Sequence, residues 1–293
     1  LQRSPTYVVS RPAEDALANW LRSKLPAKTA YRLIRWKNVL LGMYFYNMCR
    51  RKPEKVKKLI LDGVREQLGP DFDIEHFTPS YNPWDQRLCL VPNGDLFESL
   101  KEGEASVVTD HIDRFTPKGI KLKSGKELEA DLVVSATGLN MQLLSGLEVE
   151  VDGKVMDLSK TFNYKGMMYS DVPNLASSFG YTNASWTLKC DLTCEYVCRL
   201  LNHMEESGLR QATPRVTDPN MEEEPWLDLS SGYVQRAIDQ FPRQGSKKPW
   251  KLYQNYALDL MSLRFGNVED GVMEFSNPEA GAAPQPAKVA VAS

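Results

Sequence analysis

Apolar residues near the start of the chain recur at every third or fourth position, a pattern typical of amphipathic helices. One apolar stripe runs through the segment AEDALANWLRSKL, and a second runs through PEKVKKLILDGVREQLG. Pro53 stands at the start of the second segment and Gly69 closes it, as is common at helix ends. The pattern therefore predicts helices between residues 13 and 69.

Between these segments lies an apolar stretch, NVLLGMYFYNM, at residues 38–48. Arg35 and Lys37 precede it, and the basic run at residues 50–52 follows it. An apolar helix with basic flanks can lie on a membrane surface. It can also be a buried helix with solvated ends, and the pattern favours this second interpretation.

The periodicity changes at Arg87, where short apolar runs alternate with turn residues. RLCLV predicts a strand, and NGDLFESLKEG predicts a short helix capped by Asn93 or Asp95. Three more strand candidates follow in SVVTDHIDRFT, GIKLKSGKELE and DLVVSATG. The last is continuously apolar from Leu132 to Ser135, so we expect a buried central strand that ends in a tight turn.

The second half of the chain predicts a hairpin, further helices and a tail. EVEVDGKVMDL turns on the dipeptide Asp-Gly, and LASSFGYTN predicts another strand that ends in a glycine-bearing loop. A helix is expected over 187–207, with shorter helical stretches near 231–240 and 254–264. The end of the chain, residues 276–293, is rich in Pro and Ala, so we expect it to be a disordered tail.

Composition is typical of a soluble globular protein, since 42% of the 293 residues are apolar and 25% are charged. A formal net charge of -2 gives no electrostatic reason to expect nucleic acid binding. No apolar run approaches the roughly 18 residues that a membrane-spanning helix needs.

The chain has five cysteines, an odd number without secretory features, which indicates a reducing cytoplasm. Cys190, Cys194 and Cys198 recur at every fourth position and would share one face of the predicted helix. The outer two would be about 12 Å apart along the helix, too far for one metal ion to bind all three. We therefore expect small buried thiols on a packed helix face, and no metal site.

Common catalytic motifs are absent from the sequence. G-x-S-x-G, H-E-x-x-H and G-x-x-x-x-G-K-[ST] do not occur, and the three histidines are isolated from one another. No G-x-G-x-x-G loop occurs either, although a Rossmann unit normally carries one. Arg87, after YNPWDQ, could bind an anion or form a surface salt bridge, and the residues alone favour the salt bridge.

Several longer stretches carry a more specific signal: LQRSPTYVVS, RWKNVL, YNPWDQRLCLVPNGDLF, SATGLN, YKGMM, GYTNASWTLK, SGYVQRAID and PWKLYQNY. In them the chain resembles the C-terminal portion of class B flavoprotein monooxygenases. Within that family it is similar to Baeyer-Villiger monooxygenases of the type that activates the thioamide drug ethionamide. The resemblance covers nearly the whole chain except the tail.

The resemblance implies an α/β fold that is part of a flavoprotein fold with two dinucleotide-binding domains and a helical insertion. Residues 1–137 would form the C-terminal part of the NADPH-binding domain, with the helical insertion at about 13–79. Residues 138–275 would form the C-terminal part of the FAD-binding domain. The family's two Gly-rich phosphate loops would precede Leu1, so the resemblance implies a fragment that is inactive by itself.

Four residues match the NADPH contacts and the catalytic position of the family. Arg3 and Ser4 match an arginine and a hydroxyl residue that bind the 2′-phosphate of NADPH, a group suited to a forked donor. Gln86 stands where several relatives have a lysine that also contacts this phosphate. Arg87 matches the catalytic arginine, which would stabilise the anion of a C4a-peroxyflavin and hold the nicotinamide.

Seven further residues match cofactor contacts of the family. They are Trp250 and Asn255 in a mobile loop that closes over NADP, Ala136, Thr137 and Gly138 in the linker that returns to the FAD domain, and Gly180 and Asn183 near the isoalloxazine. For Trp250, ordinary hydrophobic packing is the alternative interpretation.

The resemblance implies that the protein is a monooxygenase. It would use FAD, NADPH and O2 to convert a small apolar ketone into an ester or lactone, and it would also oxygenate sulfur. One alternative is a non-catalytic remnant or interaction module, because both phosphate-binding loops are missing. Another is a related flavin N- or S-monooxygenase without Baeyer-Villiger activity. The expected location is cytoplasmic, with peripheral membrane contact as the alternative, and the sequence indicates no nucleic acid partner.

Overall fold

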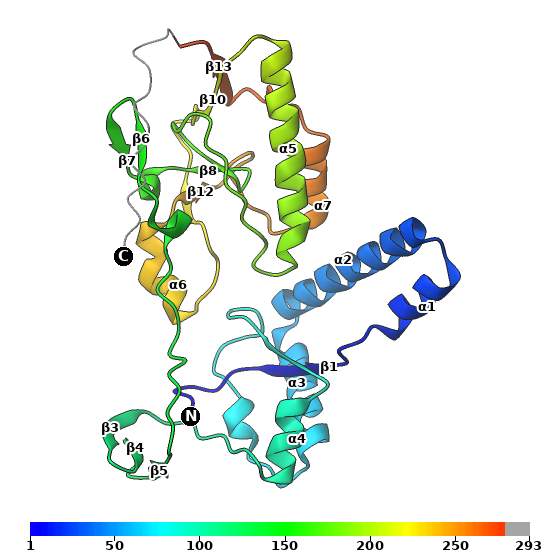
Figure 1. Cartoon of the computed structure of the whole chain (residues 1–293), viewed down its shortest axis with the longest axis vertical. Helices are drawn as coiled ribbons and strands as arrows, with labels where there is room; N and C mark the ends of the chain where they lie inside the picture. Colours follow the sequence, from blue (N-terminus) through cyan, green and yellow to red (C-terminus); the bar gives the residue numbers. More distant parts are fainter. Residues whose placement is uncertain (279–293) are drawn as a thin grey trace. The chain divides into compact units, whose positions relative to one another are not determined.

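The computed structural model describes residues 1–278, which form two compact units (Figure 1). Unit 1 comprises residues 1–141 and 227–237, and unit 2 comprises residues 142–226 and the chain from residue 238. Each unit has its own buried hydrophobic clusters. The predicted tail, residues 276–293, lies outside the described residues except for its first three positions.

Unit 1 combines a parallel strand pair, a group of helices and a three-stranded antiparallel sheet. Its strands are β1 (Val8–Arg11), β2 (Cys89–Pro92), β3 (Ile112–Thr116), β4 (Gly119–Leu122) and β5 (Glu127–Glu129). Its helices are α1 (Ala16–Lys24), α2 (Ala27–Arg51), α3 (Pro53–Leu68), the 3-10 helix η1 (Ile74–Phe77), α4 (Asp95–Glu102) and α6 (Gly232–Ala237). The helices predicted between residues 13 and 69 are therefore confirmed.

The parallel pair β1–β2 is the centre of unit 1. Val8 lies opposite Cys89, and a parallel pair of this kind needs a long crossover connection, which α1 to α3 supply. Helices α3 and α4 pack on the pair and exclude water from its apolar side chains. The buried members of this cluster are Val8, Val64, Phe77, Val91, Phe97 and Leu100.

Helix α4 forms where the sequence predicted a short helix, but the predicted capping residue is wrong. Gly94 caps it in the left-handed conformation with φ 76°, and no side chain caps the helix. Asn93 is used elsewhere, because its side-chain oxygen accepts from the Ala13 N–H at 2.8 Å. Asp95 is already inside the first turn of the helix, so neither predicted residue acts as the cap.

Unit 2 consists of one long helix, a short helix, four strand pairs and several single turns of helix. Its strand pairs are β6 (Val149–Val151) with β7 (Lys154–Met156), β8 (Asn163–Tyr164) with β9 (Met168–Tyr169), β10 (Gln211–Pro214) with β13 (Met273–Ser276), and β11 (Glu223–Pro225) with β12 (Arg243–Gly245). Its helical elements are η2 (Leu143–Gly146), η3 (Leu158–Lys160), α5 (Trp186–Glu206), η4 (Ile238–Gln240), α7 (Tyr256–Asp259) and the π-helix η5 (Leu260–Arg264).

Several predictions for the second half of the chain are confirmed. The hairpin β6–β7 turns on Asp152 and Gly153, whose φ angles of 51° and 79° are the positive values that a two-residue hairpin turn requires. The long helix expected over 187–207 is α5. Helical structure is also present near 231–240, in α6 and η4, and near 254–264, in α7 and η5.

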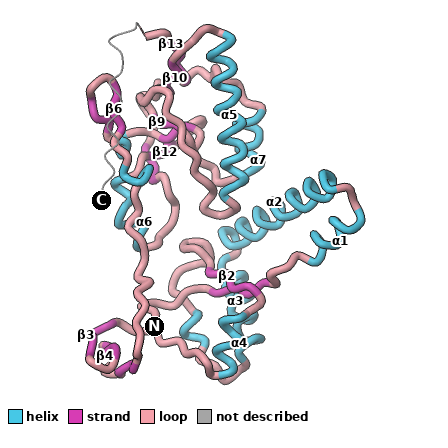
Figure 2. The backbone as a smooth tube through the Cα atoms, in the orientation of Figure 1, coloured by secondary structure: helices cyan, strands magenta, loops and turns pink. Residues whose placement is uncertain are grey.

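Two predicted strands are wrong. Residues 132–135 are loop between β5 and β6 (Figure 2), and Leu132 and Val134 are 80% and 79% exposed. An apolar run becomes a strand only where another strand can exchange backbone hydrogen bonds with it, and no described strand pairs with these residues. The segment LASSFGYTN is also loop, with a single bridge between Met168 and Ala176.

The apolar stretch at 38–48 is helical and lies within α2. The sequence pattern favoured a buried helix, but this stretch is only partly buried. Helices α1 and α3 contact α2 and cover part of its surface. Leu40, Leu41 and Tyr44 lie on the uncovered part and are exposed. Among the described residues, no helix is long and apolar enough to cross a membrane.

The cysteine stripe of α5 is not the packed face of that helix, so the prediction of buried thiols is wrong. Cys194 and Cys198 are exposed and Cys190 is partly exposed. The helix buries a neighbouring stripe instead, which carries Leu192 and Tyr196. Residues 1–278 contain no group of three or more His, Cys, Asp and Glu side chains that could hold a metal ion.

Candidate functional site

The β1–β2 pair brings together two segments that carry predicted site residues. Because the two strands run parallel, the residues that precede each of them enter the pair from the same edge. Arg3 and Ser4 precede β1, and Gln86 and Arg87 precede β2. We call these four residues the arginine edge.

Hydrogen bonds fix the chain on both sides of Arg3 and Ser4. Before them, the Gln2 N–H donates to the Val108 carbonyl at 2.9 Å, and the Gln2 side-chain amide donates to the Thr109 hydroxyl at 2.8 Å. After them, the Thr6 and Tyr81 hydroxyls share a hydrogen bond of 3.0 Å. The backbone at the arginine edge is thus anchored at both ends.

Tyr7 and Tyr81 join the two segments of the arginine edge. The Tyr7 hydroxyl donates to the Tyr81 carbonyl at 2.8 Å, and the two rings meet edge to face at 5.5 Å. Burial raises the pKa of Tyr7 to about 12, with the nearby Tyr81 adding to the rise. Tyr7 therefore stays a neutral hydrogen-bond donor over the whole physiological range of pH.

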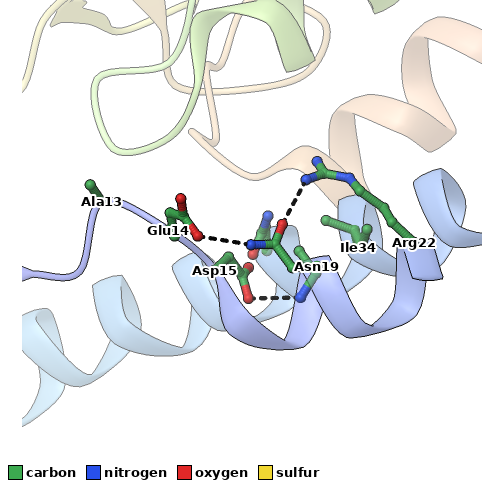
Figure 3. Close-up of a pocket in the computed structure, with 8 residues that line it drawn as sticks. Ala13, Glu14, Asp15, Asn19, Arg22 and Ile34 are labelled. Atoms are coloured by element: carbon green, nitrogen blue, oxygen red, sulfur yellow. Dashed lines mark hydrogen bonds between the residues drawn. The ribbon is translucent and has the colours of Figure 1, made fainter. Parts of the chain in front are cut away.

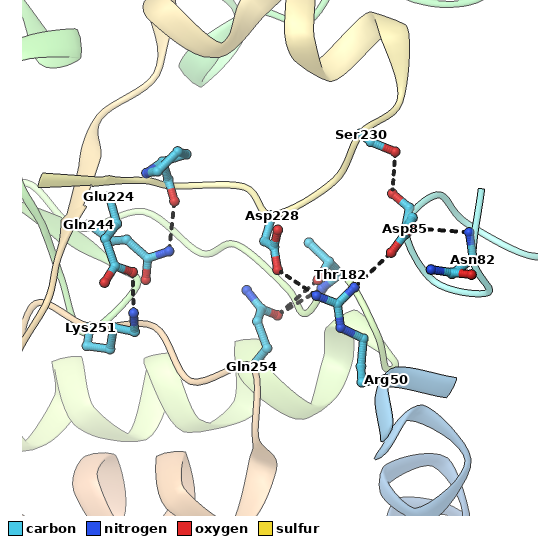
Figure 4. A network of polar contacts seen from close by, with 11 residues as sticks. Arg50, Asn82, Asp85, Thr182, Glu224, Asp228, Ser230, Gln244, Lys251 and Gln254 are labelled. Atoms are coloured by element: carbon cyan, nitrogen blue, oxygen red, sulfur yellow. Dashed lines mark hydrogen bonds and ion pairs between the residues drawn. The ribbon is translucent and has the colours of Figure 1, made fainter. Parts of the chain in front are cut away.

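Asp85 holds the turn that leads to Gln86 and Arg87. Its carboxylate accepts from the Asn82 N–H at 3.0 Å and from Arg50 at 3.0 Å, as Figure 4 shows. Its backbone carbonyl accepts from the N–H of Ser230 at 2.9 Å. Arg50 also lies 3.5 Å from the carboxylate of Asp228 (Figure 4). The aspartate is therefore used entirely for structure within unit 1.

Trp84 completes this turn in a conformation that is uncommon for a large residue. Its φ is 71°, and its indole packs edge to face on Tyr46 with a centroid distance of 5.9 Å. The indole N–H is buried without a hydrogen-bond partner among the described residues. Strained backbone of this kind persists where the surroundings fix it, and such positions cluster at functional sites.

Arg87 itself is exposed and makes no hydrogen bond or ion pair with any residue from 1 to 278. The salt bridge that the residues alone favoured is therefore not formed. Arg3 and Ser4 are also exposed, and neither has a hydrogen-bond partner among the described residues. Gln86 is half-buried and forms a backbone bridge with Pro83. The edge thus presents two permanent cations and a hydroxyl to solvent.

The residues of the predicted linker lie in the exposed loop before unit 2. Ala136, Thr137 and Gly138 are all exposed, and Gly138 has a positive φ of 113°. The backbone carbonyl of Leu139, just after them, accepts a hydrogen bond of 3.3 Å from Arg236 of α6. They do not follow a buried strand, contrary to the sequence prediction.

Gly180 and Asn183 lie in the loop before α5. Gly180 is buried, and a side chain there would clash, because a Cβ atom would lie 2.1 Å from the Trp186 ring. The Asn183 side chain donates to the backbone carbonyl of Gln254 at 2.9 Å. These two predicted site residues are therefore held by contacts inside unit 2.

Trp250 and Asn255 have clear structural roles. The indole of Trp250 is 1% exposed and packs edge to face on Phe162 and Tyr164, at centroid distances of 6.2 Å and 5.6 Å. Asn255 caps α7, because its side-chain oxygen accepts from the N–H groups of Ala257 and Leu258. Contact of the indole with a cofactor would require its segment to move, so that assignment stays a prediction.

Sequence reasoning missed two buried ion pairs in unit 2. Lys165 lies 2.9 Å from Asp270, and Lys189 lies 3.0 Å from Asp259. Burial lowers the pKa of both lysines, while their aspartates oppose the shift. The one sequence signal was a lysine beside Leu188 and Leu192 on the apolar face of a predicted helix.

Buried tyrosines extend both ion pairs. The Tyr164 hydroxyl donates to Asp270 at 2.6 Å, and the Tyr181 hydroxyl donates to Asp259 at 2.6 Å. Burial raises the pKa of each tyrosine, and the neighbouring charges act in the same direction. A cavity of about 390 Å³ opens beside Lys165 and Asp270. None of the predicted site residues lines it.

A further cavity of about 360 Å³ lies between the start of α1 and α2 (Figure 3). Its polar side chains bond to one another, with Asn19 donating to Glu14 at 3.2 Å and accepting from Arg22 at 3.3 Å. The Asp15 carboxylate accepts from the Ala18 N–H at 3.0 Å. This cavity contains no predicted site residue.

The chemistry of the arginine edge fits a phosphate-bearing ligand. Guanidinium groups and hydroxyls are good phosphate donors, and Arg3, Ser4 and Arg87 have no competing partners among residues 1–278. The predicted FAD contacts are less available. Asn183 already donates its side-chain amide to Gln254, whereas residues 136–138 lie in an exposed loop.

No protein-family model matches the chain. By sequence it is 48% identical over 277 residues to the FAD-containing monooxygenase EthA of Mycobacterium tuberculosis, which is 94% of this chain and 57% of that protein. This chain is a homologue of FAD-containing monooxygenases. It is also 48% identical over 277 residues to a protein named "Probable FAD-binding monooxygenase AlmA" of Acinetobacter, covering 56% of it. The chain thus spans a little over half the length of these curated relatives.

Solved structures agree on the fold. The structure of OTEMO with FAD and NADP matches 94% of this chain and 62% of that chain, with a TM-score of 0.61 at 13% identity. Oxidized steroid monooxygenase bound to NADP matches 94% of this chain and 61% of that chain, with a TM-score of 0.61 at 15% identity. The predicted fold class, part of an α/β flavoprotein fold with a helical insertion, is confirmed.

Proposed function

We propose that the complete protein is an FAD- and NADPH-dependent monooxygenase. It converts a small apolar ketone into an ester or lactone with one atom of O2, and it also oxygenates sulfur in thioethers or thioamides. The observation that carries the proposal is Arg87, an exposed cation without a partner in residues 1–278 at the end of a hydrogen-bonded turn. The homologous FAD-containing monooxygenases support the reaction class.

The proposed domains follow from the same assignment. Residues 1–137 belong to the NADPH-binding domain, with its helical insertion at about 13–79, and residues 138–275 belong to the FAD-binding domain. The support is that the chain divides into two compact units with a boundary near residue 141, and that α1 to α3 fill the insertion. NADP in the OTEMO and steroid monooxygenase structures supports the choice of cofactor.

Three residues of the arginine edge bind the 2′-phosphate of NADPH in this proposal. Arg3 supplies the forked donor and Ser4 supplies a hydroxyl, while Gln86 contributes an uncharged amide. Their support is the anchored backbone around Arg3 and the absence of competing partners among the described residues. Preference for NADPH over NADH therefore depends mainly on Arg3.

Arg87 stabilises negative charge that develops at the reaction centre and orients the nicotinamide. FAD, reduced by NADPH, would supply the activation of O2. Loop residues 136–138, together with Gly180 and Asn183, lie against the flavin in this proposal, and Trp250 and Asn255 belong to the segment that closes over NADP. Arg87 acts in this role as a cation and a hydrogen-bond donor, so the role needs no proton transfer.

The proposal is tested with the complete gene product. Flavin absorbance gives its FAD content, and NADPH oxidation is measured against a panel of aliphatic ketones and thioethers under ¹⁸O2. We expect bound FAD, ketone-dependent NADPH oxidation, and an ester or lactone with one labelled oxygen. Sulfoxide as the sole product would favour the S-monooxygenase alternative, and a protein without FAD or NADPH oxidation would favour the remnant or interaction module.

A second proposal concerns location, which we place in the cytoplasm with peripheral membrane contact. All five cysteines are free, α2 exposes Leu40, Leu41 and Tyr44, and the basic residues 50–52 follow at its C-terminal end. Sedimentation with vesicles containing anionic lipid tests the contact. Leu40→Ser/Leu41→Ser should reduce binding, whereas Phe115→Ser, at an exposed apolar residue of β3, should not.

A further inference from the structure

Two loops of unit 2 are joined by three hydrogen bonds around Gln254. The side-chain oxygen of Gln254 accepts from the Thr182 N–H at 3.1 Å and from the Thr182 hydroxyl at 3.3 Å (Figure 4). The backbone carbonyl of Gln254 accepts from the Asn183 side chain at 2.9 Å. We call Thr182, Asn183 and Gln254 the Gln254 latch.

The latch uses an unusual backbone conformation. Gln254 has a φ of 49°, in the left-handed region that few residues other than glycine adopt. Such a conformation persists only where the surroundings hold it, and it is common at functional sites. In this conformation the side chain and the backbone carbonyl of one residue both accept from the loop at residues 182–183.

A second contact next to the latch supports both loops. Tyr181, one residue before Thr182, donates to Asp259 at 2.6 Å, and Asp259 pairs with Lys189 of α5 at 3.0 Å. Asn255, one residue after Gln254, caps α7, which carries Asp259. The loop before α5 and the segment before α7 are therefore tied at two successive points.

We propose that Gln254 is a positioning residue that sets the distance between the flavin-side loop at 180–183 and the NADP-side segment at 250–255. This inference rests on the proposed function, which assigns Gly180 and Asn183 to FAD, and Trp250 and Asn255 to NADP. Gln254 touches neither cofactor in this role. It acts through Thr182 and Asn183, so that movement of either loop is transmitted to the other.

A glutamine suits this role because its amide oxygen accepts two hydrogen bonds while remaining uncharged. Alanine at this position would remove the acceptor and leave the Thr182 N–H unpaired. Glutamate would keep an acceptor of the same length. Asparagine adopts the left-handed conformation more readily than most residues, but its shorter side chain cannot make the same reach. The three variants therefore distinguish the effect of losing the hydrogen bond from the effect of the left-handed backbone conformation.

Hydrogen exchange of the Thr182 amide tests the contact in the complete gene product. We expect Gln254→Ala to speed this exchange by roughly five- to tenfold, as for a typical lost hydrogen bond, and Gln254→Glu to keep it slow. Gln254→Asn should resemble Gln254→Ala. Unchanged exchange in Gln254→Ala would overturn the latch, and slow exchange in Gln254→Asn would show that the backbone conformation alone protects the amide.

Steady-state kinetics test the positioning role. Gln254→Ala should raise the KM for NADPH and increase NADPH oxidation without product, with a smaller change in kcat and an unchanged FAD content. Gln254→Glu should restore the wild-type values. Wild-type kinetics in Gln254→Ala would contradict the role. A wild-type protein without FAD or NADPH oxidation would refute the proposed function instead, while the Thr182 exchange would still report on the contact itself.

Discussion

The arginine edge of unit 1 and the ion pairs of unit 2 use cations in opposite ways. Arg3 and Arg87 are exposed and have no partner among residues 1–278, whereas Lys165 and Lys189 are buried and each is paired with an aspartate. An unpaired guanidinium at the surface costs little in stability and remains available to an anion. A buried ammonium must be paired, because its desolvation is otherwise too unfavourable. Burial and pairing thus separate residues that hold the fold from residues that can bind a ligand.

The largest effect on stability should come from breaking a buried pair. Asp259→Ala leaves Lys189 buried without its carboxylate and removes the acceptor of Tyr181, so unit 2 should lose about 3 to 5 kcal/mol of unfolding free energy. Urea denaturation followed by tryptophan fluorescence measures the change. Asp218→Ala, which breaks the exposed pair with Lys247, is the matched control and should have little effect. Equal effects of the two variants would contradict the distinction between buried and exposed charges.

A smaller and selective effect is expected at the arginine edge. Arg3→Ala should weaken NADP⁺ binding by roughly 10- to 100-fold, as expected for the loss of charge-assisted hydrogen bonds, and should leave NAD⁺ binding and protein stability unchanged. Calorimetric titration of the complete gene product gives both affinities. Arg114→Ala, at an exposed arginine that pairs with Asp113, is the control. An equal loss of affinity for NADP⁺ and NAD⁺ would mean that Arg3 does not contact the 2′-phosphate.

The smallest effect concerns an exposed, paired carboxylate. Hydrogen bonding to Lys37, and then to the Ala18 N–H, holds the pKa of Asp15 below its ordinary value of 3.8. A lowered pKa means that the charged form is favoured by folding, so its contribution is present above the unfolded pKa and is lost as pH falls through the folded pKa. Asp15→Asn keeps a capping acceptor without the charge. The unfolding free energy of Asp15→Asn should therefore change less with pH below 3.8 than that of the wild type. The same pH dependence in both proteins would contradict the stabilising role of the Asp15 charge.

Local patterns predicted the helices of this chain well and its strand pairing less well. The periodicity at residues 13–69 locates α1 to α3, because each turn of a helix is closed by nearby residues. Residues 132–135 have the composition of a buried strand, but a strand forms only with a partner from elsewhere in the chain. The cysteine stripe shows a related limit: α5 has several possible faces, and only tertiary packing decides which one is buried.

The candidate site was found by resemblance more than by pattern. No periodicity singles out Arg87, and the residues alone favoured a salt bridge that is not formed. The buried lysines escaped prediction for a different reason, because Asp259 and Asp270 are distant from Lys189 and Lys165 in the sequence. Gln254 likewise shows its role only once Thr182 and Asn183 are seen beside it.

Arg87→Ala in the complete gene product tests the central claim most directly. The measurement is the rate of ester or lactone formation from a ketone, with FAD content measured on the same sample. We predict unchanged FAD content and a loss of product formation of at least roughly 100-fold, because the variant lacks the charge that stabilises the developing anion. Arg65→Ala, at an exposed arginine of α3 paired with Asp62, should retain the wild-type rate. Wild-type ketone oxygenation by Arg87→Ala would contradict the role assigned to the arginine edge.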